Sequence, residues 1–130
     1  KIRHIFVLAF AAATVMLFSC ATVHPMYQQE AKNNMNSFIA KTMANPQFSG
    51  FHLMQQTVVF PLAFNQTRDF YVPLKAYRKY IFFASGDHDT TDIDIYLYSP
   101  QGTQVAYDTN NAADAGVTHM ASQNGTYKAR

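Results

Sequence analysis

The sequence predicts a mainly β protein, an antiparallel sandwich or barrel that follows a cleavable signal segment and one N-terminal amphipathic helix. From residue 47 onward, apolar and polar side chains alternate with period two, and turn residues recur at short intervals. The chain contains 11 Phe and 8 Tyr but no Trp, and these aromatic residues suit pleated, half-buried strands. We therefore divide the 130 residues into a signal peptide (1–19), a tether with a helix (20–46) and a single sandwich domain (47–130).

The first segment has the features of a bacterial export signal. A basic stretch, residues 1–4, precedes an apolar run over residues 5–17, which is shorter than the roughly 20 residues of a membrane-spanning helix. The single cysteine, Cys20, comes directly after this run, and Leu17-Phe18-Ser19-Cys20 resembles the lipobox of bacterial lipoproteins. The resemblance implies a lipid anchor on Cys20 and a location in the cell envelope. The alternative is an ordinary cleaved signal and export in soluble form.

Residues 27–43 are predicted to form a helix. Their apolar side chains recur at spacings of three and four, which places them on one stripe (Tyr27, Ala31, Met35, Phe38, Ile39 and Met43). Asn45-Pro46 ends the pattern, because a residue that precedes proline is pushed away from helical angles. We expect the stripe to pack on the chain's own sandwich; packing on a membrane or a partner is the alternative.

Seven strands are predicted in the remaining chain, over residues 57–64, 68–74, 79–85, 92–98, 103–108, 117–121 and 126–130. Pro61 confines the first of them to a sheet edge or a bulge, because proline donates no ladder hydrogen bond. Ser99-Pro100-Gln101-Gly102 has the residue order of a type I turn.

The stretch over residues 80–98 is central to this prediction. In its second half Ile93, Ile95 and Leu97 alternate with acidic and phenolic residues, so the aliphatic set faces one side of a strand. We expect these three side chains and Phe82 to be buried between two sheets.

The strings D-F-Y-V-P-L, from Asp69, and D-I-D-I-Y-L-Y-S-P-Q-G, from Asp92, resemble the bacterial pre-peptidase C-terminal domain. That module is similar to collagenase collagen-binding domains, and the resemblance covers about half of this chain. It implies that the domain is a jelly-roll-like antiparallel β-sandwich, secreted and non-catalytic, that serves binding, solubility or processing. Here the module follows a leader and a helix instead of a peptidase. Its last strand ends at Arg130, earlier than in the family, so the sandwich domain is expected to be truncated there.

Four aspartates in this region form the densest charged group of the sequence: Asp87, Asp89, Asp92 and Asp94. Carboxylates this close repel one another unless a cation or solvent screens them, and sites made only of oxygen suit Ca²⁺. We therefore name these four as a candidate calcium site, although their spacing does not match the helix-loop-helix calcium template. The alternative is that they are solvated loop acids that discourage edge-to-edge aggregation.

The charge balance and the lack of a catalytic motif exclude some classes of function for this sequence. Two of the 10 basic residues, Lys1 and Arg3, lie in the leader, which leaves 8 basic against 8 acidic residues from Cys20 onward. This balance gives no basic footprint for nucleic acid. No catalytic motif stands out, so we expect a non-catalytic binding or accessory module of a bacterial envelope lipoprotein, with a protein or polysaccharide ligand. The alternative is the N-terminal fragment of a longer secreted hydrolase, associated with a peptidase, whose catalytic domain lies beyond residue 130.

Overall fold

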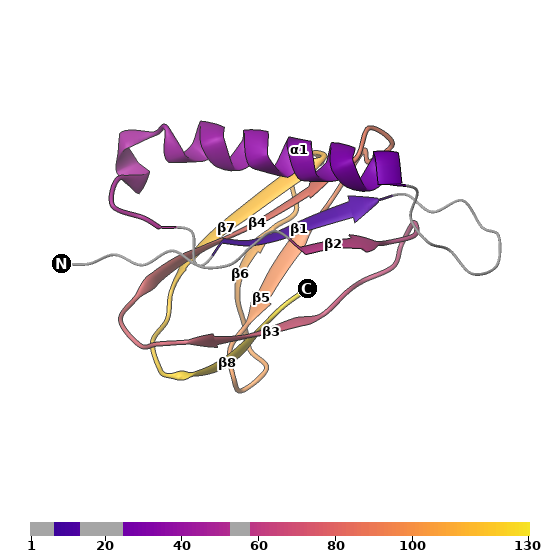
Figure 1. Cartoon of the computed structure of the whole chain (residues 1–130). Helices are drawn as coiled ribbons and strands as arrows, with labels where there is room; N and C mark the ends of the chain where they lie inside the picture. Colours follow the sequence, from indigo (N-terminus) through magenta and orange to yellow (C-terminus); the bar gives the residue numbers. More distant parts are fainter. Residues whose placement is uncertain (1–6, 14–24, 53–57) are drawn as a thin grey trace.

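Two four-stranded sheets face each other, and one long helix lies along the outer side of the first sheet (Figure 1). The computed structural model describes residues 7–13, 25–52 and 58–130. Sheet A has the strand order β2-β1-β4-β7 and sheet B the order β3-β8-β5-β6. The predicted fold class, a mainly β sandwich with one helix, is confirmed.

The described residues form eight strands, one α-helix and one short 3-10 helix. Their bounds are β1 Val7–Ala13, α1 Pro25–Met43, η1 Pro46–Phe48, β2 Val58–Pro61, β3 Phe70–Leu74, β4 Lys79–Gly86, β5 Ile95–Tyr98, β6 Gln104–Asp108, β7 Asp114–Met120 and β8 Gly125–Ala129.

Strand β1 falls inside the apolar run that the sequence predicts as the core of a signal peptide. It pairs in parallel with β4, from Val7 opposite Ile81 to Ala12 opposite Gly86, and also in parallel with β2. All other pairs among the described strands are antiparallel. In the full chain this segment therefore supplies backbone partners to two strands of sheet A, and its removal before Cys20 stays a prediction.

The helix packs on the domain's own sandwich, as the apolar stripe predicts. Ala31 and Met35 are fully buried, and Met35 belongs to a small core with Phe51, Ile81 and Phe83. Phe38 meets Phe83 edge-on, with ring centroids 5.2 Å apart. No helix among the described ranges is long and apolar enough to cross a membrane.

Strand β4 is buried on both faces, because α1 covers one side and sheet B covers the other. Ile81 and Phe83 point to the helix, whereas Phe82 and Ala84 point into the main core between the sheets. This explains why residues 80–84 of β4 form an unbroken apolar run instead of an alternating pattern.

The main core contains the four side chains that the sequence predicts to be buried. Phe82 and Leu97 are fully buried, and Ile95 and Ile93 are nearly so. In β5 the burial alternates, with Ile95 and Leu97 inside and Tyr96 and Tyr98 on the outer side. The predicted facing of this strand is confirmed.

All seven predicted strands are present, with shifted ends. Strand β7 begins early, at Asp114 and not at Val117, and β2 ends early, at Pro61 and not at Phe64. Strand β5 begins late, at Ile95 and not at Asp92. The reason is that the Asp92 carboxylate accepts a hydrogen bond from the Ala112 backbone N–H at 3.3 Å, so this part of the chain is held as a loop. Strand β2, which contains Pro61, is an edge strand of sheet A, as predicted.

The predicted turn at residues 99–102 is also present. The Gly102 N–H donates to the Ser99 carbonyl at 2.9 Å, and Gly102 has φ 82, a left-handed conformation that glycine adopts without a steric penalty. The Ser99 N–H donates to the Thr103 carbonyl at 2.8 Å. This turn fixes the connection between β5 and β6.

Candidate functional site

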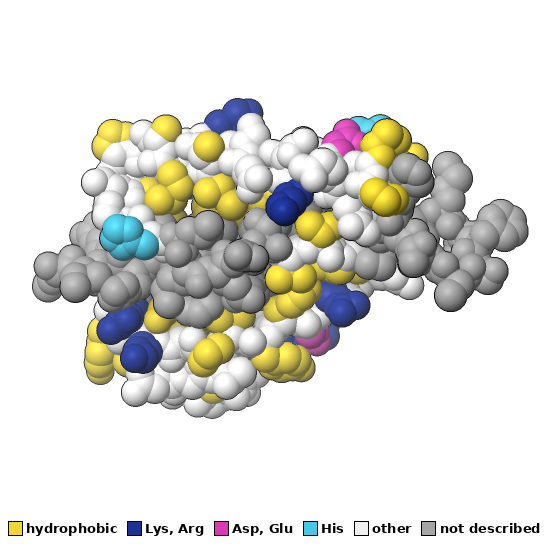
Figure 2. All heavy atoms as spheres, in the orientation of Figure 1, with side chains coloured by type: hydrophobic (Ala, Val, Ile, Leu, Met, Phe, Trp, Pro, Cys, Tyr) yellow, Lys and Arg dark blue, Asp and Glu magenta, His cyan; other side chains and the backbone are white. Residues whose placement is uncertain are grey.

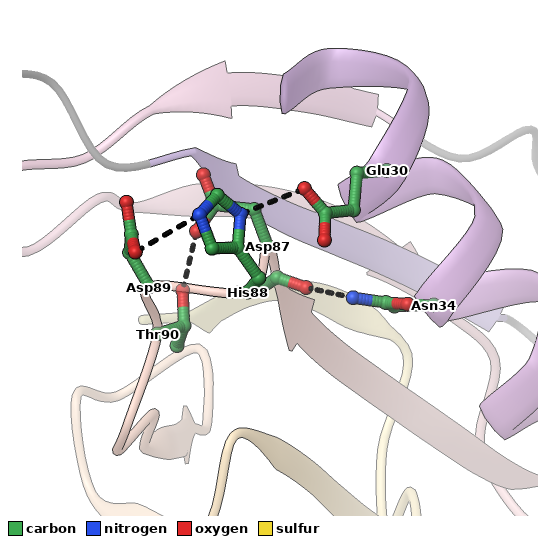
Figure 3. A network of polar contacts seen from close by, with 7 residues as sticks. Glu30, Asn34, Asp87, His88, Asp89 and Thr90 are labelled. Atoms are coloured by element: carbon green, nitrogen blue, oxygen red, sulfur yellow. Dashed lines mark hydrogen bonds and ion pairs between the residues drawn. The ribbon is translucent and has the colours of Figure 1, made fainter. Parts of the chain in front are cut away.

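The loop after β4 carries the first two aspartates of the candidate calcium site and lies against the N-terminal half of α1 (Figure 3). The His88 ring stands between two carboxylates, with Nδ1 2.8 Å from Glu30 and Nε2 3.1 Å from Asp89. The Asn34 side-chain amide donates to the Gly86 carbonyl at 2.9 Å. The hydrogen bond to Glu30 raises the pKa of His88, and the negative charge of Asp89 acts in the same direction. These contacts tie the loop to the helix.

The structure gives each of the four aspartates a different environment. Asp87 is buried and accepts a hydrogen bond from the Thr90 hydroxyl at 3.2 Å, whereas Asp89 is exposed. Asp92 caps a backbone N–H of the following loop, and Asp94 accepts from the Tyr96 hydroxyl at 3.2 Å. Within the described part of the chain, no three His, Cys, Asp or Glu side chains form a group that could hold a metal ion. The calcium site therefore stays a prediction.

Two other carboxylates serve the sandwich itself. Asp108 accepts from the Gly116 N–H at 2.9 Å, and Asp114 accepts from the buried Ser85 hydroxyl. Each carboxylate accepts a hydrogen bond from a neighbouring strand, so a structural role accounts for both residues without a ligand.

A different surface has the composition of a binding site. The outer side of sheet B carries four tyrosines and two basic residues, which we call the tyrosine face: Tyr71, Tyr96, Tyr98, Tyr107, Lys128 and Arg130. Tyr71 and Tyr107 keep 68% and 63% of their surface exposed. Hydrophobic side chains, a class that includes tyrosine here, lie beside basic ones in the region of β3 and β8 (Figure 2).

Strand pairing explains how these residues come together. Lys128 on β8 lies opposite Tyr71 on β3 and opposite Tyr98 on β5, and Tyr96 lies opposite Tyr107 on β6. Side chains that are paired across neighbouring strands lie on the same side of a sheet. The tyrosine face is therefore continuous across all four strands of sheet B.

Ion pairs hold the basic side chains of this face in place. Arg130 donates two hydrogen bonds to Asp69, from Nε at 2.6 Å and from an Nη atom at 2.9 Å. These bonds lower the pKa of Asp69 and raise that of Arg130. Lys128 Nζ lies 4.5 Å from the centroid of the Tyr98 ring and 3.9 Å from Asp69. The basic groups are thus positioned by neighbours on the same surface before any ligand arrives.

The phenol of Tyr96 is kept in its neutral form. Partial burial raises its pKa, and its hydrogen bond to the Asp94 carboxylate raises the pKa further. The group therefore acts as a hydrogen-bond donor and an apolar ring, and it carries no charge near neutral pH.

The alternation along β5 predicts that Tyr96 and Tyr98 lie on the outer side of their strand, but the sequence alone does not predict the tyrosine face. Tyr71 precedes the buried Val72, and Tyr107 follows the half-buried Ala106, so each lies at an outward position of its own strand. The alternation of side chains along each strand is therefore enough to predict these outward positions. The order of strands in sheet B, which aligns the four tyrosines, cannot be predicted from that alternation.

Cys20, the predicted lipidation site, lies outside the described residues. No family model matches this sequence, and a search of curated proteins finds no match. The resemblance to a pre-peptidase C-terminal domain therefore stays a prediction that rests on the quoted residues.

Proposed function

We propose that this chain is a non-catalytic binding module of a bacterial envelope lipoprotein, held to the membrane through Cys20, and that it binds an extended protein segment on the tyrosine face. The observation that carries the proposal is the alignment of four tyrosines across one sheet. The resemblance of residues 69–130 to the pre-peptidase C-terminal and collagen-binding modules supports the same class of function.

Immobilising a tyrosine side chain against a partner costs little free energy. A tyrosine has two side-chain torsions, so little conformational entropy is lost when its ring is fixed against a partner. Tyr71 and Tyr107 stand on β3 and β6, the two edge strands of sheet B, and their exposed rings present apolar area together with a polar hydroxyl. Aromatic and arginine side chains dominate the binding energy of many protein interfaces. A sheet surface suits an elongated partner, which can contact several strands at once.

The test uses the full chain with Cys20→Ser and immobilised polymers: gelatin as an extended polypeptide, and chitin and peptidoglycan as polysaccharides. The informative variant is the double change Tyr71→Ala and Tyr107→Ala. Loss of an interface aromatic costs about 2 kcal/mol when the residue is a major contributor, so retention on gelatin should fall by at least tenfold.

Tyr77→Ala is the matched control, because Tyr77 is 85% exposed but lies in the turn between β3 and β4. Unchanged retention of this variant, with loss in the double variant, supports the tyrosine face. Equal loss in both variants contradicts it. Retention on a polysaccharide but not on gelatin excludes the protein partner, and retention on none of the three polymers contradicts the binding function.

A further inference from the structure

A cleft of about 490 Å³ opens at the end of the sandwich where the loop from β2 to β3 faces the loop from β4 to β5. This volume is within the range of ligand pockets. Its floor is made of core side chains, including Phe60, Ala84, Ile93 and Ile95. The cleft thus gives a ligand access to apolar surface at the edge of the main core.

The two walls of the cleft differ in charge. Asp89, Asp92 and Asp94 line the side formed by the loop from β4 to β5. Arg68 and Arg130 line the cleft as well, but each already has an anionic or aromatic neighbour. Arg130 is paired with Asp69, and the Arg68 guanidinium carbon lies 5.6 Å from the centroid of the Phe60 ring.

The carboxylates of this wall keep the capacity to bind a cation. The hydrogen bond from Ala112 uses one oxygen of Asp92, and the bond from Tyr96 uses one oxygen of Asp94. An ionised carboxylate accepts several hydrogen bonds at its two oxygens, so both groups can accept more donors. Three carboxylates on one wall also disfavour an anionic ligand.

Aromatic rings complete the cleft. Phe64 lies on the loop from β2 to β3, is 91% exposed and lines the cleft. Tyr96 lines the edge that the cleft shares with the tyrosine face. A cation with an aliphatic stem matches this combination, because the stem packs on apolar surface, the charged head pairs with carboxylates, and an aromatic ring attracts the cation. Lysine and arginine side chains have this structure.

We infer that the cleft between the β2–β3 and β4–β5 loops binds a basic side chain, lysine or arginine, of a polypeptide partner. The stem of that side chain lies over the apolar floor, and its charged head meets Asp92 and Asp94. This site adjoins the tyrosine face but does not depend on it, because a short peptide is enough to fill it.

The test measures binding of blocked, fluorescently labelled pentapeptides to the full chain with Cys20→Ser. The peptides differ only at the central residue, which is lysine, arginine, glutamine or glutamate. We expect binding of the lysine and arginine peptides, at least tenfold weaker binding of the glutamine peptide, and none of the glutamate peptide. Asp92→Asn combined with Asp94→Asn should weaken binding of the lysine peptide by roughly tenfold, as expected for the loss of two exposed ion pairs.

Glu30→Gln is the control, because it removes a carboxylate from α1, outside the cleft lining. The asparagine variants keep an oxygen that accepts the bonds from Ala112 and Tyr96, and thermal unfolding checks that they fold. If a variant does not fold, the inference is tested by comparing the four peptides on the chain that carries only Cys20→Ser. Equal binding of the glutamine and lysine peptides overturns the inference, as does equal loss in Glu30→Gln. Binding of chitin oligosaccharides without any peptide also overturns it.

Discussion

Replacement of Leu97 by alanine tests the packing of the sandwich most directly. Leu97 is fully buried in the main core, and the residues paired with it on either side are Ala106 and Ala129. Their methyl groups are too short to fill the space that the leucine leaves. A residual cavity adds to the lost transfer free energy, so the cost should lie in the upper part of the usual range, about 3–5 kcal/mol.

The measurement is the free energy of unfolding from urea titrations of the full chain with Cys20→Ser. Leu97→Met conserves volume and should cost less than about 1.5 kcal/mol. Tyr96→Ala, on the outer side of the same strand, should cost about 1 kcal/mol or less. If Tyr96→Ala proved more destabilising than Leu97→Ala, the register of β5 would be wrong by one residue, because such a slip exchanges the two faces.

Three further outcomes are expected. Cys20→Ser should abolish incorporation of labelled fatty acid and detergent partitioning; normal labelling of this variant would contradict the lipoprotein prediction. Calcium at a hundredfold excess over its dissociation constant should stabilise the chain by about 2.7 kcal/mol, and Asp89→Asn should remove the effect; an unchanged midpoint, with magnesium as control, would leave the aspartates as loop acids. Burial lowers the pKa of His119, whose Nε2 has no hydrogen-bond partner among the described residues. The unfolded chain therefore binds this proton more readily, and stability should fall as the pH drops below about 6.5. His119→Phe should reduce this fall in unfolding curves at about pH 5 and about pH 8. His88 has a raised pKa and acts in the opposite sense, since its contribution is present below about 6.5 and is lost as the pH rises through its folded value. His88→Gln should therefore leave the loss of stability at acidic pH unchanged. If stability still falls to the same extent at acidic pH in His119→Phe, the loss does not come from His119.

The local structure of the helix and of the strands follows from the spacing of apolar residues along the chain. The spacing of Ala31, Met35 and Phe38 indicated a helix with one buried stripe, and the alternation of Ile95 and Leu97 with tyrosines indicated a strand with one buried face. Both patterns arise from the backbone period of a single element, so neither needs knowledge of the rest of the fold.

Which elements lie side by side becomes visible only in the folded chain. The order β3-β8-β5-β6 aligns tyrosines from three strands, and the cleft joins residues of two loops that are distant in the sequence. The same applies to Val7–Ala13, which reads as an apolar signal core by composition but pairs with β2 and β4 in the full chain. A short apolar run is compatible with a signal-peptide core and with a buried strand. Its composition shows that its side chains avoid water, but it does not specify which segment packs against them.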